Sequence, residues 1–151
     1  MNVESDKVRI VEVSPRDGLQ FEKIILSTAQ KIHFIDSLSA CGFQSIEVTS
    51  FVSANKISQL SDAEQVCQKI VRHRDVRYSA LAPNMEGLNR ALEAGVDSIA
   101  VFTAASDTFC EKNISCNIKE SLRRFKPVLE LAKQKNISVR AYISCSFACP
   151  Y

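Results

Sequence analysis

Long apolar runs and a strong net charge are both missing from this chain of 151 residues. No apolar segment approaches the roughly 20 residues that a membrane-spanning helix needs, so we expect no membrane among its partners. The formal net charge is only +2, which creates no strong field for nucleic acid, and no nucleic-acid partner is expected. The longest basic cluster, Arg72-His73-Arg74, is followed by Asp75 and is typical of a solvated helix end.

Nucleotide-binding glycine motifs and paired metal-binding histidines are also missing. Neither Gly-x-Gly-x-x-Gly nor a P-loop occurs, which disfavours a dinucleotide-binding domain. The two histidines, His33 and His73, form no His-x-His pair, so we expect them on the surface or in packing. Cys145 and Cys149 are four positions apart, which indicates core or loop thiols more than a zinc site.

A disulfide framework is not expected, although the chain has six cysteines. Their spacing is irregular, and a domain of this size can bury a core without cross-links. The segment Met1–Asp6 is polar and acidic, unlike a signal peptide or an arginine-rich transit peptide. These features predict reduced thiols and a cytoplasmic location.

Strand-like and helix-like segments alternate through a single predicted domain, residues 1–151, in which 46% of the residues are hydrophobic. Because helical segments separate the predicted strands, the strands should lie parallel in one sheet. Right-handed connections then leave two architectures, an open doubly wound sheet or part of an eight-stranded barrel. The five predicted strands are residues 8–13, 45–49, 76–81, 98–102 and 138–144.

Capping signals predict where the helices begin. Residues 27–30 form a capping box that opens a helix ending near Gly42, and residues 61–64 open a second helix that reaches about Arg72. A short helix is predicted over 85–94, and a long one begins near Asn117. The predicted apolar face of the long helix carries Leu122, Phe125, Leu129 and Ala132.

Polar residues follow the predicted strands, and Arg16-Asp17-Gly18 is the sharpest such feature. The carboxyl ends of the strands form the functional face in both architectures. A carboxylate such as Asp17 suits Mg²⁺ or Mn²⁺, and an arginine such as Arg16 can bind a carboxylate or stabilise an enolate. A surface turn with an exposed ion pair explains the same spacing.

Two charged residues interrupt strands that are otherwise apolar and β-branched. Glu47 lies between Ile46 and Val48, and Arg140 lies between Val139 and Ala141. A buried charge needs a partner, so the two could pair inside a barrel or contact a ligand. A solvated position on an edge strand is the alternative for Glu47.

Several stretches resemble hydroxymethylglutaryl-CoA lyases, and together they cover nearly the whole chain from Val8 on. The Arg-Asp-Gly element is shared with wider relatives, such as the isopropylmalate and homocitrate synthases. The stretches Thr49–Ser53 and Asn113–Cys116 are more specific to the lyases. The matching stretches are residues 11–20, 46–53, 81–84, 104–106, 113–116, 138–145 and 149–151.

The resemblance implies an α/β fold of the parallel (β/α) TIM-barrel type, here a partial barrel of about five strands. It implies a divalent-metal lyase that cleaves 3-hydroxy-3-methylglutaryl-CoA, an acyl-CoA substrate, to acetyl-CoA and acetoacetate, as in leucine degradation and ketone body formation. Asp17 matches the metal-ligating aspartate, Arg16 the arginine that binds the substrate and steadies the enolate, and Glu47 a catalytic glutamate. Gln20 and Arg140 match substrate-binding motifs. The expected cofactor is Mg²⁺ or Mn²⁺, whose coordination a single carboxylate cannot complete.

The resemblance is limited to the first part of the family's barrel, which has eight strands. No residues match the family's His-x-His ligands, its asparagine ligand or its glycine-rich loop with a catalytic cysteine. We therefore expect the isolated chain to be inactive. One alternative is a non-catalytic partial barrel that associates with itself, as a homo-oligomer, or with a complementary C-terminal half. Another is a Claisen-type acyl-CoA synthase, which the lyase-specific stretches disfavour.

Overall fold

The computed structural model of the protein describes residues 8–151, and its centre is one parallel sheet of four strands in the order β1-β2-β3-β4. Each strand lies beside the strand that precedes it along the chain, as right-handed βα units require. The predicted α/β class with a parallel sheet is confirmed. The strands are β1 (Ser45–Ser50), β2 (Arg77–Leu81), β3 (Ser98–Ala104) and β4 (Ser138–Ser144).

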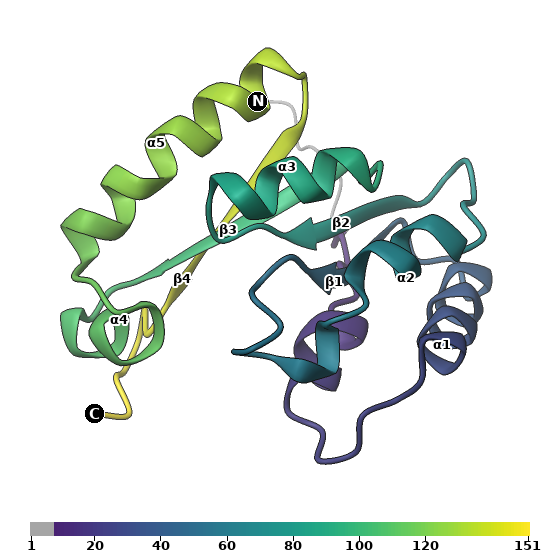
Figure 1. Ribbon diagram of the computed structural model, residues 1–151, viewed down its shortest axis with the longest axis horizontal. Helices are drawn as coiled ribbons and strands as arrows, with labels where there is room; N and C mark the ends of the chain where they lie inside the picture. Colours follow the sequence, from purple (N-terminus) through teal and green to yellow (C-terminus); the bar gives the residue numbers. More distant parts are fainter. Residues whose placement is uncertain (1–7) are drawn as a thin grey trace.

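Helices follow the strands along the sheet (Figure 1). The α-helices are α1 (Thr28–Ala40), α2 (Ala63–Lys69), α3 (Met85–Glu93), α4 (Asp107–Ile114) and α5 (Ile118–Gln134), with a π-helix η1 (Ser14–Gly18) and a 3₁₀ helix η2 (Ser58–Leu60). Within residues 8–151 no helix is long and apolar enough to cross a bilayer.

The two faces of the sheet differ in polarity because side chains alternate along a strand. One face packs against the helices through buried residues such as Ile46, Tyr78 and Ile99. The other face carries Glu47 and, further along the sheet, Tyr142. The hydrogen bond between these two side chains joins the outer strands, so the sheet curls as the wall of a partial barrel.

The strand predicted over residues 8–13 is wrong in extent. Glu12 alone pairs with β1, where its N–H donates to the carbonyl of Ser45 at 2.9 Å and its carbonyl accepts from the N–H of Glu47 at 2.8 Å. Among the described residues this segment has a neighbouring strand on one side only. Pro15, without an N–H, then turns the chain into η1. The described sheet therefore has four strands and one bridge instead of five strands.

Most of the predicted helices are present, with two corrections to their details. Ser27 and Gln30 cap α1 reciprocally, as predicted. The second capping box, in which Ser61 and Glu64 would cap each other, is wrong: the N-cap of α2 is Asp62, whose side chain makes no capping hydrogen bond, Glu64 binds Arg90 instead, and the helix ends at Lys69. The predicted face of the long helix is also partly wrong. Helix α5 buries Ser121, Phe125, Val128 and Ala132, whereas Leu122 and Leu129 are exposed.

Candidate functional site

Helix η1 places the Arg-Asp-Gly element beside the first strand of the sheet. The N–H of Asp17 donates to the carbonyl of Val13 at 2.7 Å, and the N–H of Arg16 donates to the same carbonyl at 3.1 Å. Buried Pro15 fixes the start of the turn. The side chain of Arg16 is therefore directed to the polar face of the sheet, whereas the side chain of Asp17 is 49% exposed.

Arg16, Glu47 and Tyr142 form a network across that face. The guanidinium of Arg16 bonds to Oε1 of Glu47 through Nε and to Oδ1 of Asp17 through Nη1, the latter at 2.5 Å. The hydroxyl of Tyr142 donates to Oε2 of Glu47 at 2.8 Å. The guanidinium carbon of Arg16 lies 5.9 Å from the centre of the Tyr142 ring. Both oxygens of Glu47, which is fully buried, thus have a donor.

The network keeps Tyr142 protonated. Burial and the hydrogen bond to the Glu47 carboxylate raise the pKa of Tyr142 to about 12, and the nearby guanidinium groups of Arg140 and Arg16 oppose the shift. The phenol is therefore a hydrogen-bond donor at neutral pH. Its role in the network is to hold Glu47, which in turn holds Arg16.

A cavity of about 1000 Å³ opens at the carboxyl ends of the strands, where the predicted site was expected. It brings together three of the predicted residues, Arg16, Asp17 and Gln20, with Tyr142. Arg140 does not line this cavity; it lines a second one that also contains Ser45 and Arg77, the first residues of β1 and β2. The substrate-binding role of Arg140 stays a prediction.

Two residues of this region were missed by sequence reasoning. Tyr142 lies two positions after Arg140, so strand alternation alone places both on one face of β4. Ser50, the last residue of β1, is buried, and its hydroxyl has no hydrogen-bond partner among the described residues. Nothing in the local pattern around Ser50 distinguishes it from an ordinary strand-end serine.

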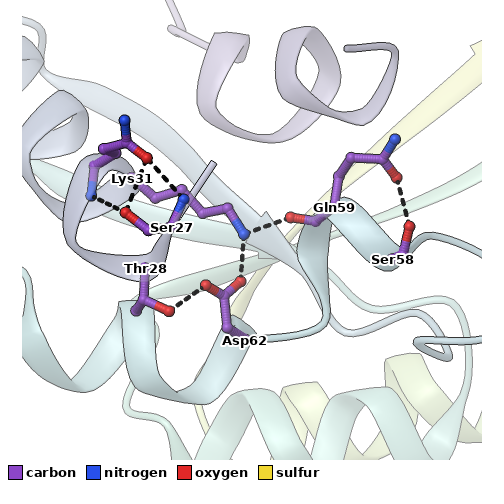
Figure 2. A network of polar contacts seen from close by, with 7 residues as sticks. Ser27, Thr28, Lys31, Ser58, Gln59 and Asp62 are labelled. Atoms are coloured by element: carbon purple, nitrogen blue, oxygen red, sulfur yellow. Dashed lines mark hydrogen bonds and ion pairs between the residues drawn. The ribbon is translucent and has the colours of Figure 1, made fainter. Parts of the chain in front are cut away.

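A hydrogen-bond network of Thr28, Lys31, Gln59 and Asp62, called the polar clasp below, holds the loops that line the cavity (Figure 2). Buried Lys31 on α1 donates to the carbonyl of Gln59 at 2.5 Å and to Oδ1 of Asp62 at 2.6 Å, and Thr28 donates to Oδ2 of Asp62 at 2.6 Å. The side-chain amide of Gln59 also donates to the carbonyl of Glu22 at 2.9 Å. The clasp thus connects the loop after η1 with the loop after β1, both of which contribute to the cavity wall.

The clasp depends on an ionised carboxylate. Burial acts to raise the pKa of Asp62, but the hydrogen bonds from Lys31 and Thr28 outweigh it, and the pKa lies below its ordinary value of 3.8. The Asp62 carboxylate is therefore ionised at neutral pH, and its ion pair with Lys31 joins α1 to the start of α2.

The described residues do not complete a metal site. Asp17 offers a carboxylate to the cavity, but Oδ1 is already bonded to Arg16. Within residues 8–151 no cluster of three His, Cys, Asp or Glu side chains could hold a metal ion. A divalent cation needs about six oxygen ligands, so Asp17 could supply one of them and the described chain could not form the site alone.

Comparisons with known proteins agree with this geometry. The HMGL-like family matches residues 7–151. The chain is 52% identical over 145 residues to the 3-hydroxy-3-isohexenylglutaryl-CoA/hydroxy-methylglutaryl-CoA lyase of Pseudomonas aeruginosa, covering 96% of the chain and 48% of that protein. It is 48% identical to the mitochondrial hydroxymethylglutaryl-CoA lyase of Homo sapiens, covering 96% and 45%, respectively.

Solved structures give the same result. The crystal structure of the Pseudomonas aeruginosa hydroxymethylglutaryl-CoA lyase superimposes with a TM-score of 0.93 over 96% of the chain and 48% of its own length. An HMG-CoA lyase from Acinetobacter baumannii, in complex with coenzyme A and 3-methylmalate, is 37% identical and has a TM-score of 0.93 over 100% and 49%, respectively.

The chain spans about half the length of the curated relatives it matches. Over that half, the predicted resemblance to hydroxymethylglutaryl-CoA lyases is confirmed in sequence and in three dimensions. The TIM-barrel type of the fold is confirmed by the same structures. With the family match extending over residues 7–151, the chain belongs to the HMGL-like family.

Proposed function

We propose that this chain provides the part of a carbon–carbon lyase site that contains Arg16. The complete site would cleave 3-hydroxy-3-methylglutaryl-CoA to acetyl-CoA and acetoacetate. The observation that carries the proposal is the fixed guanidinium of Arg16 at the cavity of the strand ends, with Glu47 and Tyr142 behind it. The names of the relatives, which are lyases for this class of thioester, support the choice of substrate. They give no support to the Claisen-type synthase alternative.

The proposed cleavage is a retro-Claisen reaction. The tertiary hydroxyl loses its proton, and its oxygen forms the new ketone of acetoacetate as the carbon–carbon bond breaks. The electron pair of that bond leaves on the acetyl-CoA fragment as an enolate, which then takes a proton on carbon. Charge develops on the enolate oxygen, so a fixed cation beside that oxygen lowers the barrier.

Arg16 is the residue we assign to that oxygen. Its Nε and Nη1 atoms bond to Glu47 and Asp17, whereas Nη2 forms no hydrogen bond within residues 8–151. A guanidinium held by two nitrogens can present the third to the substrate without reorganisation. Glu47, with both oxygens occupied, acts as the positioning residue of Arg16, and Tyr142 positions Glu47.

We also propose that Asp17 contributes one ligand to a Mg²⁺ or Mn²⁺ ion and that Gln20 contacts the substrate, since both line the cavity. A bound divalent cation would polarise the oxygens of the substrate. Because the described residues offer too few ligands, no step of the proposal depends on the ion. Arg140, two positions before Tyr142, would act on the substrate only through its charge.

Acetoacetate release tests the proposal. The chain would be assayed with Mg²⁺ or Mn²⁺ and the CoA thioester, alone and mixed with the C-terminal half of the Pseudomonas lyase. We expect no acetoacetate release from the chain alone and metal-dependent release from the mixture. In Arg16→Gln the rate of release should fall at least about 100-fold, because the variant lacks the guanidinium that stabilises the transition state. Arg123→Gln, on exposed α5, is the matched control. A mixture without activity, or one in which both variants behave alike, contradicts the proposal.

A second candidate function, association without catalysis, is favoured by the outer strand β4. Ala141 and Ile143 on this strand are exposed, and Phe147 after it is fully exposed. Apolar groups on an open strand edge suit a second copy of the chain or a complementary half-barrel. Light scattering tests this candidate, and a monodisperse monomer with cooperative unfolding would contradict it.

The compartment is a proposal as well. The polar segment Met1–Asp6, on which the cytoplasmic prediction depends, lies outside the described residues. A relative from Danio rerio is named as cytoplasmic and the human relative above as mitochondrial, so the relatives support either location. We propose the cytoplasm, and fractionation of cells that express the chain tests it.

A further inference from the structure

Two cysteines lie close together at the end of β4, outside the network of Arg16, Glu47 and Tyr142. Cys145 directly follows the strand, and its φ of 60° is in the left-handed region. The hydroxyl of the next residue, Ser146, donates to the carbonyl of Ile143 at 2.8 Å. The chain turns at this point, and the side chain of Cys149 interacts with that of Cys145. Both thiols are free in the structure.

The segment around Cys149 is anchored on helix α4. The hydroxyl of Ser106, the N-cap of α4, donates to Sγ of Cys149 at 3.0 Å. The ring centre of Tyr151 lies 6.0 Å from that of Phe109 and 3.9 Å from Nζ of Lys112, both of which belong to α4. The two cysteines are thus held together by contacts that the described residues make among themselves.

The surroundings of the two sulfurs divide the roles between them. The pKa of Cys149 is lowered, first by the hydrogen bond from Ser106 and then by the N–H of Tyr151. The positive charge of Lys112 acts in the same direction. The pKa of Cys145 is raised, because desolvation and then the neighbouring Cys149 disfavour its charged form. The thiolate is the nucleophilic form of a cysteine, so Cys149 is suited to the first attack and Cys145 to the second.

The other four cysteines differ from this pair in exposure or in place. Cys67 and Cys110 are buried, and desolvation raises the pKa of Cys67 to about 12. Cys116 is partly buried. Cys41 is exposed, but it follows helix α1, which lies on the opposite side of the molecule from α4 (Figure 1). Cys41 therefore serves as a reference for an exposed thiol that is distant from the pair.

We propose that Cys145 and Cys149 are a redox-sensitive pair, which a low-molecular-weight disulfide converts to a disulfide within the chain. The thiolate of Cys149 attacks one sulfur of the small disulfide, whose S–S bond breaks, and one small thiolate leaves and takes a proton. Cys145 then loses its proton and attacks the sulfur of Cys149, which releases the second small thiol. Two protein thiols are thereby oxidised by two electrons, and one small disulfide is reduced to two thiols.

The bond should be labile, because its two ends lie only four positions apart in the sequence. Closing so short a loop removes little entropy from the unfolded chain, so the disulfide adds little stability and is readily reduced again. Ser144, next to Cys145, lines the cavity at the carboxyl ends of the strands, so oxidation restrains a loop at the wall of that cavity. The proposal is independent of the lyase function, because neither of its steps involves the CoA thioester.

Mass spectrometry of the full chain incubated with oxidised glutathione tests the proposal. We expect the wild type to lose the mass of two hydrogen atoms and peptide mapping to place the new bond between Cys145 and Cys149. Cys145→Ser should instead accumulate one glutathione on Cys149, because the second attacking thiol is missing. Cys149→Ser should react at least about tenfold more slowly than the wild type. Cys41→Ser, which removes an exposed thiol elsewhere, is the matched control and should behave as the wild type.

Three results would overturn the proposal. The first is a bond that joins Cys145 to Cys110 or that links two chains. The second is oxidation of Cys149→Ser at the rate of the wild type. The third is faster addition of glutathione to Cys41 than to Cys149, which would mean that exposure alone decides the reactivity. Circular dichroism of each variant shows whether the fold is retained, and exposed Cys149 fills no core position whose change to serine would unfold the chain.

Discussion

The hydroxyl of Tyr142 donates to Oε2 of Glu47 at 2.8 Å, although the two residues lie on the two outer strands of the sheet. Neighbouring strands are about 4.8 Å apart, so a flat sheet would separate β1 and β4 by about 14 Å. A tyrosine side chain alone does not span that separation, and the contact therefore requires a strongly curled sheet. The curl also brings the ring of Tyr142 to 5.9 Å from the guanidinium of Arg16.

Alkaline pH should weaken the fold through Tyr142. Its pKa is about 12 in the folded chain and about 10.0 in the unfolded chain. The stability that this shift contributes is fully present below pH 10 and is lost as the pH rises to 12. Urea unfolding across this pH range should show that the unfolding free energy falls more steeply with pH in the wild type than in Tyr142→Phe. Parallel curves for the two proteins would contradict the hydrogen bond to Glu47.

Replacing Glu47 by glutamine should cost about 3 kcal/mol of unfolding free energy, because it leaves the Arg16 guanidinium partly buried without its main counter-charge. Chemical denaturation at neutral pH measures the change. Glu93→Gln, on the exposed side of α3, is the matched control and should remain within about 0.5 kcal/mol of the wild type. Equal midpoints for the two variants would show that the network contributes no stability.

The Lys31 ammonium should contribute to the stability of the loops around the larger cavity. Lys31→Met keeps the aliphatic stem but leaves the Asp62 carboxylate with Thr28 as its remaining side-chain donor, and we expect a loss of about 2–3 kcal/mol. Hydrogen exchange should also become faster in the loop around Gln59. Lys126→Met, at an exposed position of α5, should change neither measurement.

Acid should weaken the same clasp. The pKa of Asp62 is below 3.8 in the folded chain, so its contribution is present above about pH 4 and is lost as the pH falls through the folded value. Asp62→Asn removes this titration. Thermal unfolding between pH 5 and pH 2.5, about the range in which carboxylates titrate, should therefore be less pH-dependent in the variant. A variant with unchanged pH dependence would exclude Asp62 as the source.

Helix α5 offers a test of which face is buried. Val128→Ala removes methyl groups from a fully buried position and should cost about 2 kcal/mol. Leu122→Ala removes a larger group from an exposed position and should cost less than about 0.5 kcal/mol. The denaturant midpoints of the two variants rank the two losses of stability. A larger loss for Leu122→Ala than for Val128→Ala would mean that the face predicted from the sequence pattern is the buried one.

The order of strands and helices was predictable because hydrophobic periodicity and capping residues are local signals. Ser27 illustrates this, since its capping partner is only three positions away. The second capping box failed because a more distant group, Arg90, binds the Glu64 carboxylate that would have reached back to Ser61. Distant partners of this kind leave no trace in a local pattern.

The candidate site was predictable to a similar extent. The Arg-Asp-Gly element and Glu47 were found from strand-end position and from the charge inside an apolar strand, and the structure joins Arg16 to both acidic residues. Tyr142 was missed because an aromatic residue in a strand is an ordinary core residue. Its function in the network depends on the curl of the sheet, which no single segment encodes.

The order β1-β2-β3-β4 means that each strand finds its neighbour already present as the chain is synthesised. The sheet can therefore grow by one strand at a time, with short steps in sequence that cost little loop entropy. The Glu47–Tyr142 bond spans 95 positions and forms only when β4 has been added. Until then the Glu47 carboxylate lacks its second donor, so the network of Arg16, Glu47 and Tyr142 should be the last part of this chain to become protected during folding.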